Sequence, residues 1–100
     1  MAGRQVRTVA LVGVGLMGGS LGLAARERAG VAEVRGFGQT RATLDLALER
    51  GAITAACDSL EEACRDAELV FVCTPVRLVV RHVREALRAA PPEAVVTDVG

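Results

Sequence analysis

The stretch that decides the fold is VALVGVGLMGGSLGLAARERAG, residues Val9–Gly30. It begins with an apolar run, passes through five glycines between Gly13 and Gly22, and ends in a helical pattern. Each glycine inside a helix destabilises it by about 0.5–1 kcal/mol relative to alanine. A helix that begins among glycines therefore indicates that something other than helix propensity requires a bare backbone at this point.

The spacing of three of these glycines is G-x-G-x-x-G, formed by Gly13, Gly15 and Gly18. The motif follows a predicted strand and opens a predicted helix, which is the context that the dinucleotide fingerprint requires. The first glycine permits a tight turn, the second lets a pyrophosphate approach the backbone, and the third lets the helix pack against the sheet. The N-terminus of such a helix favours anions through its free N–H groups and its dipole. The residues predicted to hold the diphosphate are Gly13, Val14, Gly15, Leu16, Met17 and Gly18. The alternative is that the glycines serve packing alone.

Apolar runs alternate with helical patterns along the chain. Continuous apolar runs are typical of parallel strands whose two faces are both covered by helices. We expect strands at Thr8–Val12, Glu33–Phe37, Thr54–Cys57, Leu69–Cys73 and Ala94–Val99. We expect helices at Leu16–Ala29, Arg41–Arg50, Ser59–Asp66 and Arg77–Ala90. This order predicts an α/β fold, a Rossmann-type doubly wound parallel sheet with strand order 3-2-1-4-5, and one dinucleotide-binding domain over residues 1–100.

The last predicted helix has an apolar stripe at i, i+3, i+4 spacing. The residues expected to face the sheet are Val79, Val80, Val83, Ala86 and Leu87. The one histidine of the chain, His82, lies in the same helix, and we expect it to be a surface or partly packed side chain.

Composition excludes several classes of partner. The formal net charge is zero, which argues against nucleic acid, because nucleic-acid-binding domains usually carry a strong basic bias. No apolar stretch reaches the about 18 residues that a membrane span needs. The three cysteines form no CxxC pair, so we expect a reduced, cytoplasmic protein without a metal site.

The residues after the fingerprint narrow the class of enzyme. The chain reads GVGLMGGSLGLAARE around the glycines, CTPV at Cys73–Val76, and VTDVG at Val96–Gly100. This combination resembles the prephenate/arogenate dehydrogenase family of tyrosine biosynthesis, in which these motifs recur in this order. The resemblance implies oxidative decarboxylation of prephenate or arogenate, with a hydride passing to a nicotinamide cofactor.

The resemblance also implies parts that these 100 residues do not include. The family's catalytic histidine lies after the TDxGS segment, and His82 does not match its position. A largely helical second domain completes the substrate site and a homodimer. We therefore expect the chain to be the cofactor half of an enzyme, catalytically incomplete by itself.

The segment after the fourth predicted strand is the other part of the expected cofactor site. The resemblance places Cys73, Thr74, Pro75 and Val76 beside the nicotinamide. Thr74 is the one candidate catalytic residue, because its hydroxyl could reach the reacting centre. The alternative is that Thr74 satisfies backbone groups at the end of the strand.

The choice of cofactor depends on the end of the second predicted strand. NAD-dependent Rossmann domains place an acidic residue there to bind the adenosine ribose. Here the expected position is Gly38, followed by Gln39, Thr40 and Arg41, which offer an amide, a hydroxyl and a guanidinium to a phosphate. The sequence therefore favours NADP over NAD, and the alternative is a protein that accepts either.

Two other functions remain open at this stage. The domain could belong to another NAD(P)-dependent dehydrogenase, or it could be a stand-alone nucleotide-sensing Rossmann module. The residues that follow Gly100 in the gene would distinguish these from the main hypothesis.

Overall fold

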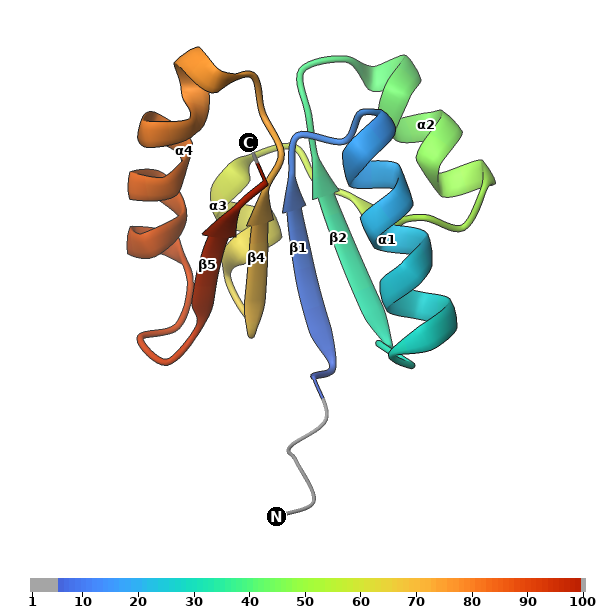
Figure 1. Ribbon diagram of the computed structural model, residues 1–100, viewed down its shortest axis with the longest axis horizontal. Helices are drawn as coiled ribbons and strands as arrows, with labels where there is room; N and C mark the ends of the chain where they lie inside the picture. The colour runs from blue at the N-terminus through green and yellow to red at the C-terminus, as the bar shows by residue number, and fades with distance from the viewer. Residues whose placement is uncertain (1–5, 100) are drawn as a thin grey trace.

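The computed structural model describes residues 6–99, whose strands and helices alternate along the chain (Figure 1). The strands are β1 (Thr8–Val12), β2 (Glu33–Phe37), β3 (Ala55–Ala56), β4 (Leu69–Val72) and β5 (Val95–Asp98). The helices are α1 (Leu16–Arg28), α2 (Arg41–Glu49), α3 (Leu60–Cys64) and α4 (Val76–Ala89). All neighbouring strands are parallel and their order is β3-β2-β1-β4-β5, which confirms the predicted doubly wound sheet.

Helices cover both faces of the sheet, and β1 contributes side chains to the hydrophobic core on each face. Val9 and Leu11 pack into the core under α1 and α2, whereas Ala10 and Val12 pack into the core under α3 and α4. All four side chains are at most 1% exposed. This double burial explains why β1 is apolar without interruption.

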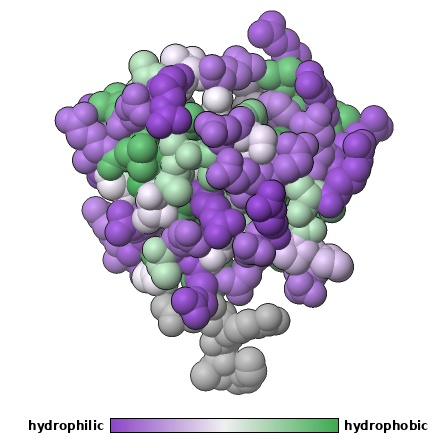
Figure 2. Space-filling view, turned by 180° about the vertical axis from the view of Figure 1, so that it is seen from behind, coloured by the Kyte–Doolittle hydropathy of each residue, from purple (hydrophilic) through white to green (hydrophobic). Residues whose placement is uncertain are grey.

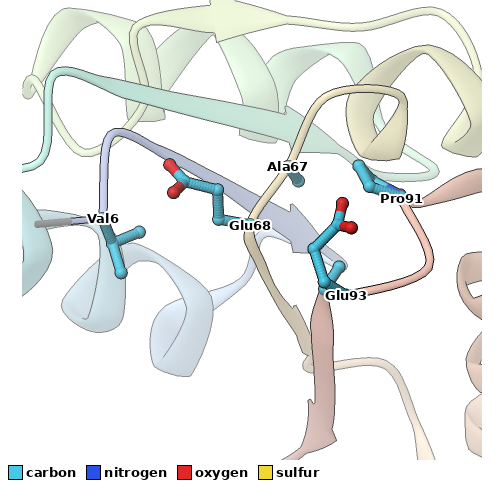
Figure 3. Close-up of a pocket in the computed structure, with 6 residues that line it drawn as sticks. Val6, Ala67, Glu68, Pro91 and Glu93 are labelled. Atoms are coloured by element: carbon cyan, nitrogen blue, oxygen red, sulfur yellow. The ribbon is translucent and has the colours of Figure 1, made fainter. Parts of the chain in front are cut away.

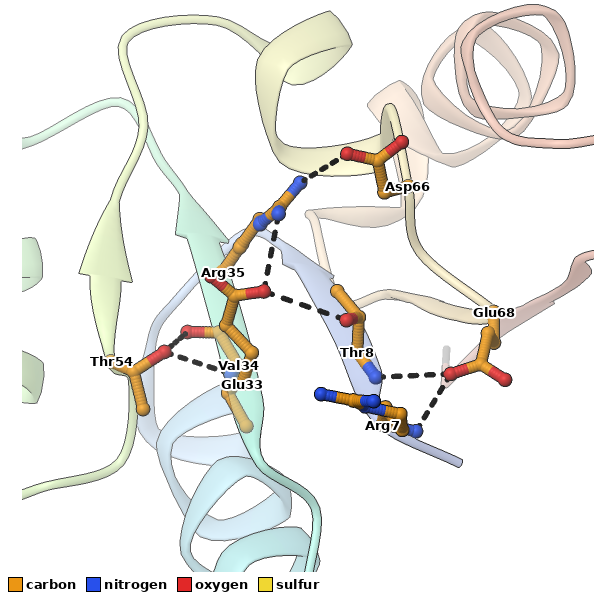
Figure 4. Close-up of polar contacts among 8 residues, drawn as sticks. All are labelled: Arg7, Thr8, Glu33, Val34, Arg35, Thr54, Asp66 and Glu68. Atoms are coloured by element: carbon orange, nitrogen blue, oxygen red, sulfur yellow. Dashed lines mark hydrogen bonds and ion pairs between the residues drawn. The ribbon is translucent and has the colours of Figure 1, made fainter. Parts of the chain in front are cut away.

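Polar contacts hold the amino-terminal ends of the strands together (Figure 4). One carboxylate oxygen of Glu68 accepts hydrogen bonds from the backbone N–H groups of Arg7 and Thr8, at 2.7 and 3.2 Å. The carboxylate of Glu33 pairs with the guanidinium of Arg35 at 3.1 Å. The Glu33 side chain is therefore paired at this edge of the sheet and lies away from the glycine motif, which is at the carboxyl end of β1.

The predicted ends of the strands and helices agree with the observed ends to within two residues. Ser59 caps α3 by accepting a hydrogen bond from the N–H of Glu62 at 3.1 Å, as the capping-box spacing predicts. The carboxylate of Glu62 in turn accepts from the N–H of Asp58 at 3.1 Å. The helix itself ends at Cys64, two residues earlier than expected.

The predicted buried stripe of α4 is partly wrong. Val80 and Leu87 are 63% and 60% exposed, whereas His82 is 9% exposed and Ala86 is fully buried. The sheet-facing row includes His82 and Ala86, and Val79 beside it is half-buried. Apolar residues lie on more than one side of this helix, so two neighbouring stripes satisfy the same 3.6-residue period and periodicity alone could not choose between them.

The exposed large apolar side chains include a row on one side of α4, formed by Val76, Val80 and Leu87. Seen from behind, the molecule is mostly hydrophilic with small separate hydrophobic patches (Figure 2). Val95, on the edge strand β5, is 59% exposed. Among the helices of residues 6–99, none is long and apolar enough to cross a membrane.

Close packing of α1 predicts opposite effects of alanine at two of its glycines. A Cβ on Gly22 would clash with the carbonyl oxygen of Ala52, in the segment after α2, whereas a Cβ on Gly19 meets nothing within 4 Å. We expect Gly22→Ala to lower the free energy of unfolding by about 1–3 kcal/mol through overpacking. Gly19→Ala, the matched control, should raise it by about 0.5–1 kcal/mol through helix propensity. Urea unfolding followed by circular dichroism measures both, and equal effects of the two substitutions would contradict this packing.

Candidate functional site

The turn between β1 and α1 is built on Gly13, whose φ of +91° lies in a region that other residues rarely adopt. Its N–H donates a hydrogen bond of 2.6 Å to the carbonyl of Phe37, at the end of β2. A Cβ on Gly13 would lie 2.8 Å from Cγ2 of Thr74 and 3.0 Å from the carbonyl carbon of Cys73. The turn is therefore packed between the carboxyl ends of β2 and β4, and only glycine fits it.

The other two glycines of the motif differ in what surrounds them. A Cβ on Gly18 would lie 2.6 Å from the carbonyl oxygen of Gly13, so Gly18 lets α1 approach the turn. A Cβ on Gly15 would meet no atom within 4 Å. Packing therefore explains Gly13 and Gly18 but gives no reason for a glycine at position 15. A ligand that approaches the backbone would supply that reason.

The helix α1 begins without a side-chain cap. Its N-cap is Gly15, which makes no side-chain cap, and the first turn carries no acidic residue. A helix N-terminus leaves up to four N–H groups without a partner inside the helix, and the helix dipole adds a partial positive charge. This end of α1 suits an anion such as a diphosphate.

A hollow of about 170 Å³ lies beside this N-terminus, at the carboxyl end of the sheet. It is lined mainly by the loops that follow β1, β2 and β4, and α2 and α4 each add one residue. The lining residues are Gly13, Val14, Gly15, Phe37, Gly38, Gln39, Thr40, Thr43, Cys73, Thr74, Pro75 and His82. In a doubly wound sheet such a crevice lies where the strand order reverses, here on either side of β1, and it is where ligands bind.

Two polar atoms in the wall of the hollow are buried without a hydrogen-bond partner, Oγ1 of Thr74 and Nδ1 of His82. The Thr74 hydroxyl therefore does not satisfy backbone groups at the end of β4, which was the alternative role for it. A buried polar atom left unpaired costs about 1–3 kcal/mol, so such atoms are usually paired in the functional state of a protein.

Cysteine chemistry does not account for the hollow. Burial raises the pKa of the Cys73 thiol above its ordinary value, so the group is a neutral thiol near pH 7 rather than a nucleophilic thiolate. Burial likewise raises the pKa of Cys64 to about 11. Within residues 6–99 no group of three or more His, Cys, Asp and Glu side chains is placed to hold a metal ion.

The structure brings together most of the predicted site residues, but it leaves some outside the hollow. Gly18 is buried in the first turn of α1 and Val76, which is 81% exposed, begins α4, whereas the side chains of Leu16 and Met17 lie outside the part of the chain that the structure describes. Arg41 lies at the start of α2, where its guanidinium pairs with Asp45 at 3.1 Å.

Three residues of the hollow were not predicted from the sequence: Phe37, Thr43 and His82. Phe37 is the last residue of β2 and Thr43 lies one helical turn after Thr40, so both follow from the position of the predicted loop. His82 was expected at or near the surface, and the orientation of α4 buries it instead.

A second hollow, of about 190 Å³, lies at the opposite, amino-terminal edge of the sheet (Figure 3). Its lining includes Val6 and the carboxylate-bearing residues Glu68 and Glu93. Two carboxylates repel phosphate, so this hollow does not suit a dinucleotide. The carboxyl-end hollow is the candidate site.

Comparison with known proteins agrees with the geometry. Residues 21–100 match the family model described as prephenate dehydrogenase, nucleotide-binding domain. The chain belongs to this family. The match begins inside α1, so the glycine turn before it adds independent support. No curated protein matches the chain in sequence.

Solved structures of related enzymes share the fold. Synechocystis arogenate dehydrogenase is 31% identical, with a TM-score of 0.83 over 93% of this chain and 32% of that one. Prephenate dehydrogenase from A. aeolicus, in complex with hydroxyphenyl propionate and NAD+, is 24% identical, with a TM-score of 0.84 over 95% of this chain and 34% of that one. The family domain therefore spans about a third of the length of these two enzymes.

The unpaired hydroxyl of Thr74 predicts an unusual response to substitution. Thr74→Val keeps the shape and removes the buried oxygen, so it should raise the free energy of unfolding of the free chain by about 1 kcal/mol. Thr74→Ser keeps the hydroxyl but loses the methyl group that packs against Gly13, so this substitution should lower the free energy of unfolding by about 1 kcal/mol. Urea unfolding measures both, and a clear loss of stability in Thr74→Val would show that the hydroxyl has a partner in the free chain.

Proposed function

We propose that this chain is the nicotinamide-cofactor-binding domain of an oxidoreductase that oxidatively decarboxylates prephenate or arogenate. The observation that carries the proposal is the bare N-cap Gly15, which opens α1 without a cap or an acidic residue beside the carboxyl-end hollow. The family supports the same reaction class. The bound cofactor would supply the hydride acceptor for this oxidation.

The residues of this chain have two proposed tasks in that reaction. The N–H groups of Gly15 and the first turn of α1 bind the diphosphate, and the loops after β2 and β4 enclose the two halves of the dinucleotide. Thr74 lies between the ends of β1 and β4, against Gly13. Its unpaired hydroxyl supports a role in hydrogen-bonding the nicotinamide half or the substrate, which would orient the reacting carbon.

The remaining parts of the proposed activity come from the family rather than from these residues. They are a small-molecule substrate, a downstream catalytic histidine, a second, largely helical domain and a homodimer, while the proposed cytoplasmic location rests on the unpaired cysteines of this chain. Another NAD(P)-dependent dehydrogenase or a nucleotide sensor would use the same hollow but would not act on prephenate or arogenate.

We further propose that the domain prefers NADP to NAD. Gly38 stands where an NAD-specific domain carries a carboxylate, and Gln39 and Thr40 line the hollow beside it. The side chain of Arg41 is 63% exposed and that of its partner Asp45 is 59% exposed, so their ion pair is weak and Arg41 can turn to a 2′-phosphate. Without a carboxylate at position 38, the repulsion that excludes this phosphate is absent.

Binding of the cofactor tests the proposed function through Gly15. Gly15→Val puts a branched side chain where the pyrophosphate meets the backbone, so affinity for NADP+ should fall by more than about tenfold, or about 1.4 kcal/mol. Because a Cβ at this position meets no protein atom, the fold should be unchanged by circular dichroism. Gly19→Ala, a neighbouring glycine with equal space, serves as the control and should bind as the parent does. Calorimetric titration gives the dissociation constants, and unchanged affinity in Gly15→Val would place the phosphate site elsewhere.

Cofactor preference is tested with two variants of the loop after β2. We expect the parent to bind NADPH about ten- to a hundredfold more tightly than NADH, the scale of one charge-assisted hydrogen bond. Arg41→Ala should weaken NADPH binding selectively. Gly38→Asp should shift the preference toward NADH, and it fits sterically because a Cβ there lies 3.5 Å from the backbone nitrogen of Val14. Equal affinities in the parent, with Arg41→Ala affecting both cofactors alike, would contradict the preference.

A further inference from the structure

Apart from the thiols of Cys57 and Cys64, His82 is the one buried side chain with a polar or charged group among residues 6–99. It is 9% exposed, and its Nδ1 has no hydrogen-bond partner. Its neighbours on the same face of α4 are Val79 and Ala86, three residues before and four residues after it. An apolar side chain of similar volume would fill this position without leaving a polar atom unpaired, so packing alone does not explain an imidazole here.

The direction of the side chain links it to the cofactor hollow. Side chains on a helix tilt toward its N-terminus, and the N-terminus of α4 follows β4 at the carboxyl edge of the sheet. His82 accordingly lines the same hollow as Thr74, whose Oγ1 is also unpaired. Two unpaired polar atoms in one wall indicate that a polar ligand completes the wall.

The opposite wall identifies which part of a dinucleotide would lie there. It is formed by Phe37, Gly38, Gln39 and Thr40, from the loop after β2. In Rossmann domains this loop binds the adenosine ribose, while the diphosphate lies at the glycine turn. A ligand between this loop and His82 is therefore the adenosine half of the cofactor.

We propose that His82 is a cofactor-positioning residue that hydrogen-bonds the adenosine half of the dinucleotide, directly or through one ordered water. The inference rests on the proposed function and adds to it a residue that is not part of the glycine fingerprint. Neutral imidazole carries both a donor and an acceptor nitrogen, so it can serve a ribose hydroxyl, an adenine ring nitrogen or a water molecule.

Two substitutions separate hydrogen bonding from packing. His82→Leu keeps an apolar body of similar size and removes both nitrogens. His82→Asn is the matched control, because its amide places a polar atom close to the position of Nδ1. The ligands are ADP-ribose, which contains the adenosine half and the diphosphate but no nicotinamide, and NADP+. Calorimetric titration gives the affinities, and thermal unfolding of the free chain gives the stability.

We expect His82→Leu to weaken ADP-ribose and NADP+ by the same factor, about three- to tenfold, and His82→Asn to retain most of the affinity. The free His82→Leu chain should melt at or above the temperature of the parent, because the unpaired nitrogen is gone. A histidine with a merely structural role would give the opposite pattern, a lower melting temperature with unchanged affinity.

The outcomes distinguish the inference from the function on which it rests. A parent chain that binds neither ADP-ribose nor NADP+ overturns both. A parent that binds both ligands, with His82→Leu indistinguishable from it, overturns only the role of His82. Weakening of NADP+ without weakening of ADP-ribose also overturns it, because the contact would then lie at the nicotinamide half.

Discussion

The backbone of α1 approaches two other backbones more closely than any side chain permits. A Cβ at Gly18 would meet the carbonyl of Gly13, and one at Gly22 would meet the carbonyl of Ala52. This approach holds α1 against the turn after β1 and against the segment that leads into β3. Within this turn, the N–H of Gly13 donates a hydrogen bond to the carbonyl of Phe37, which holds the turn beside the end of β2. The relative placement of β1, β2 and the helices on that face depends on this contact.

The same constraint creates the candidate site. Because α1 begins directly at the carboxyl end of β1, its N-terminus opens into the crevice between the loops after β2 and β4. Gly15 lies at this opening, where no protein atom comes within 4 Å of a Cβ. The wall beyond it carries the unpaired Thr74 and His82 atoms. Groups that cost stability in the free chain are thus gathered where a polar, anionic ligand would pair with them.

The sequence predicted the features that depend on local pattern. The order of the strands, the glycine turn and the Ser59 cap follow from periodicity and spacing, and all three are confirmed. The face that α4 turns toward the sheet could not be predicted. The exposed residues Val80 and Leu87 fit the helical period as well as the buried residues do. The burial of His82 depends on that orientation and was missed for the same reason. Arg41 and Asp45 are four residues apart on α2, a spacing that permits their ion pair but does not require it, so the pair could not be predicted from the sequence.

We propose that a dinucleotide binds at the carboxyl end of the sheet, with its diphosphate on the N-terminus of α1. Backbone amide chemical shifts of the isotope-labelled chain, recorded during titration with NADP+, test it most directly. We expect the largest changes at residues 13–18, with further changes at residues 38–40 and 73–75. Changes confined to the amino-terminal hollow around Glu68 and Glu93, or no changes at saturating NADP+, would contradict it.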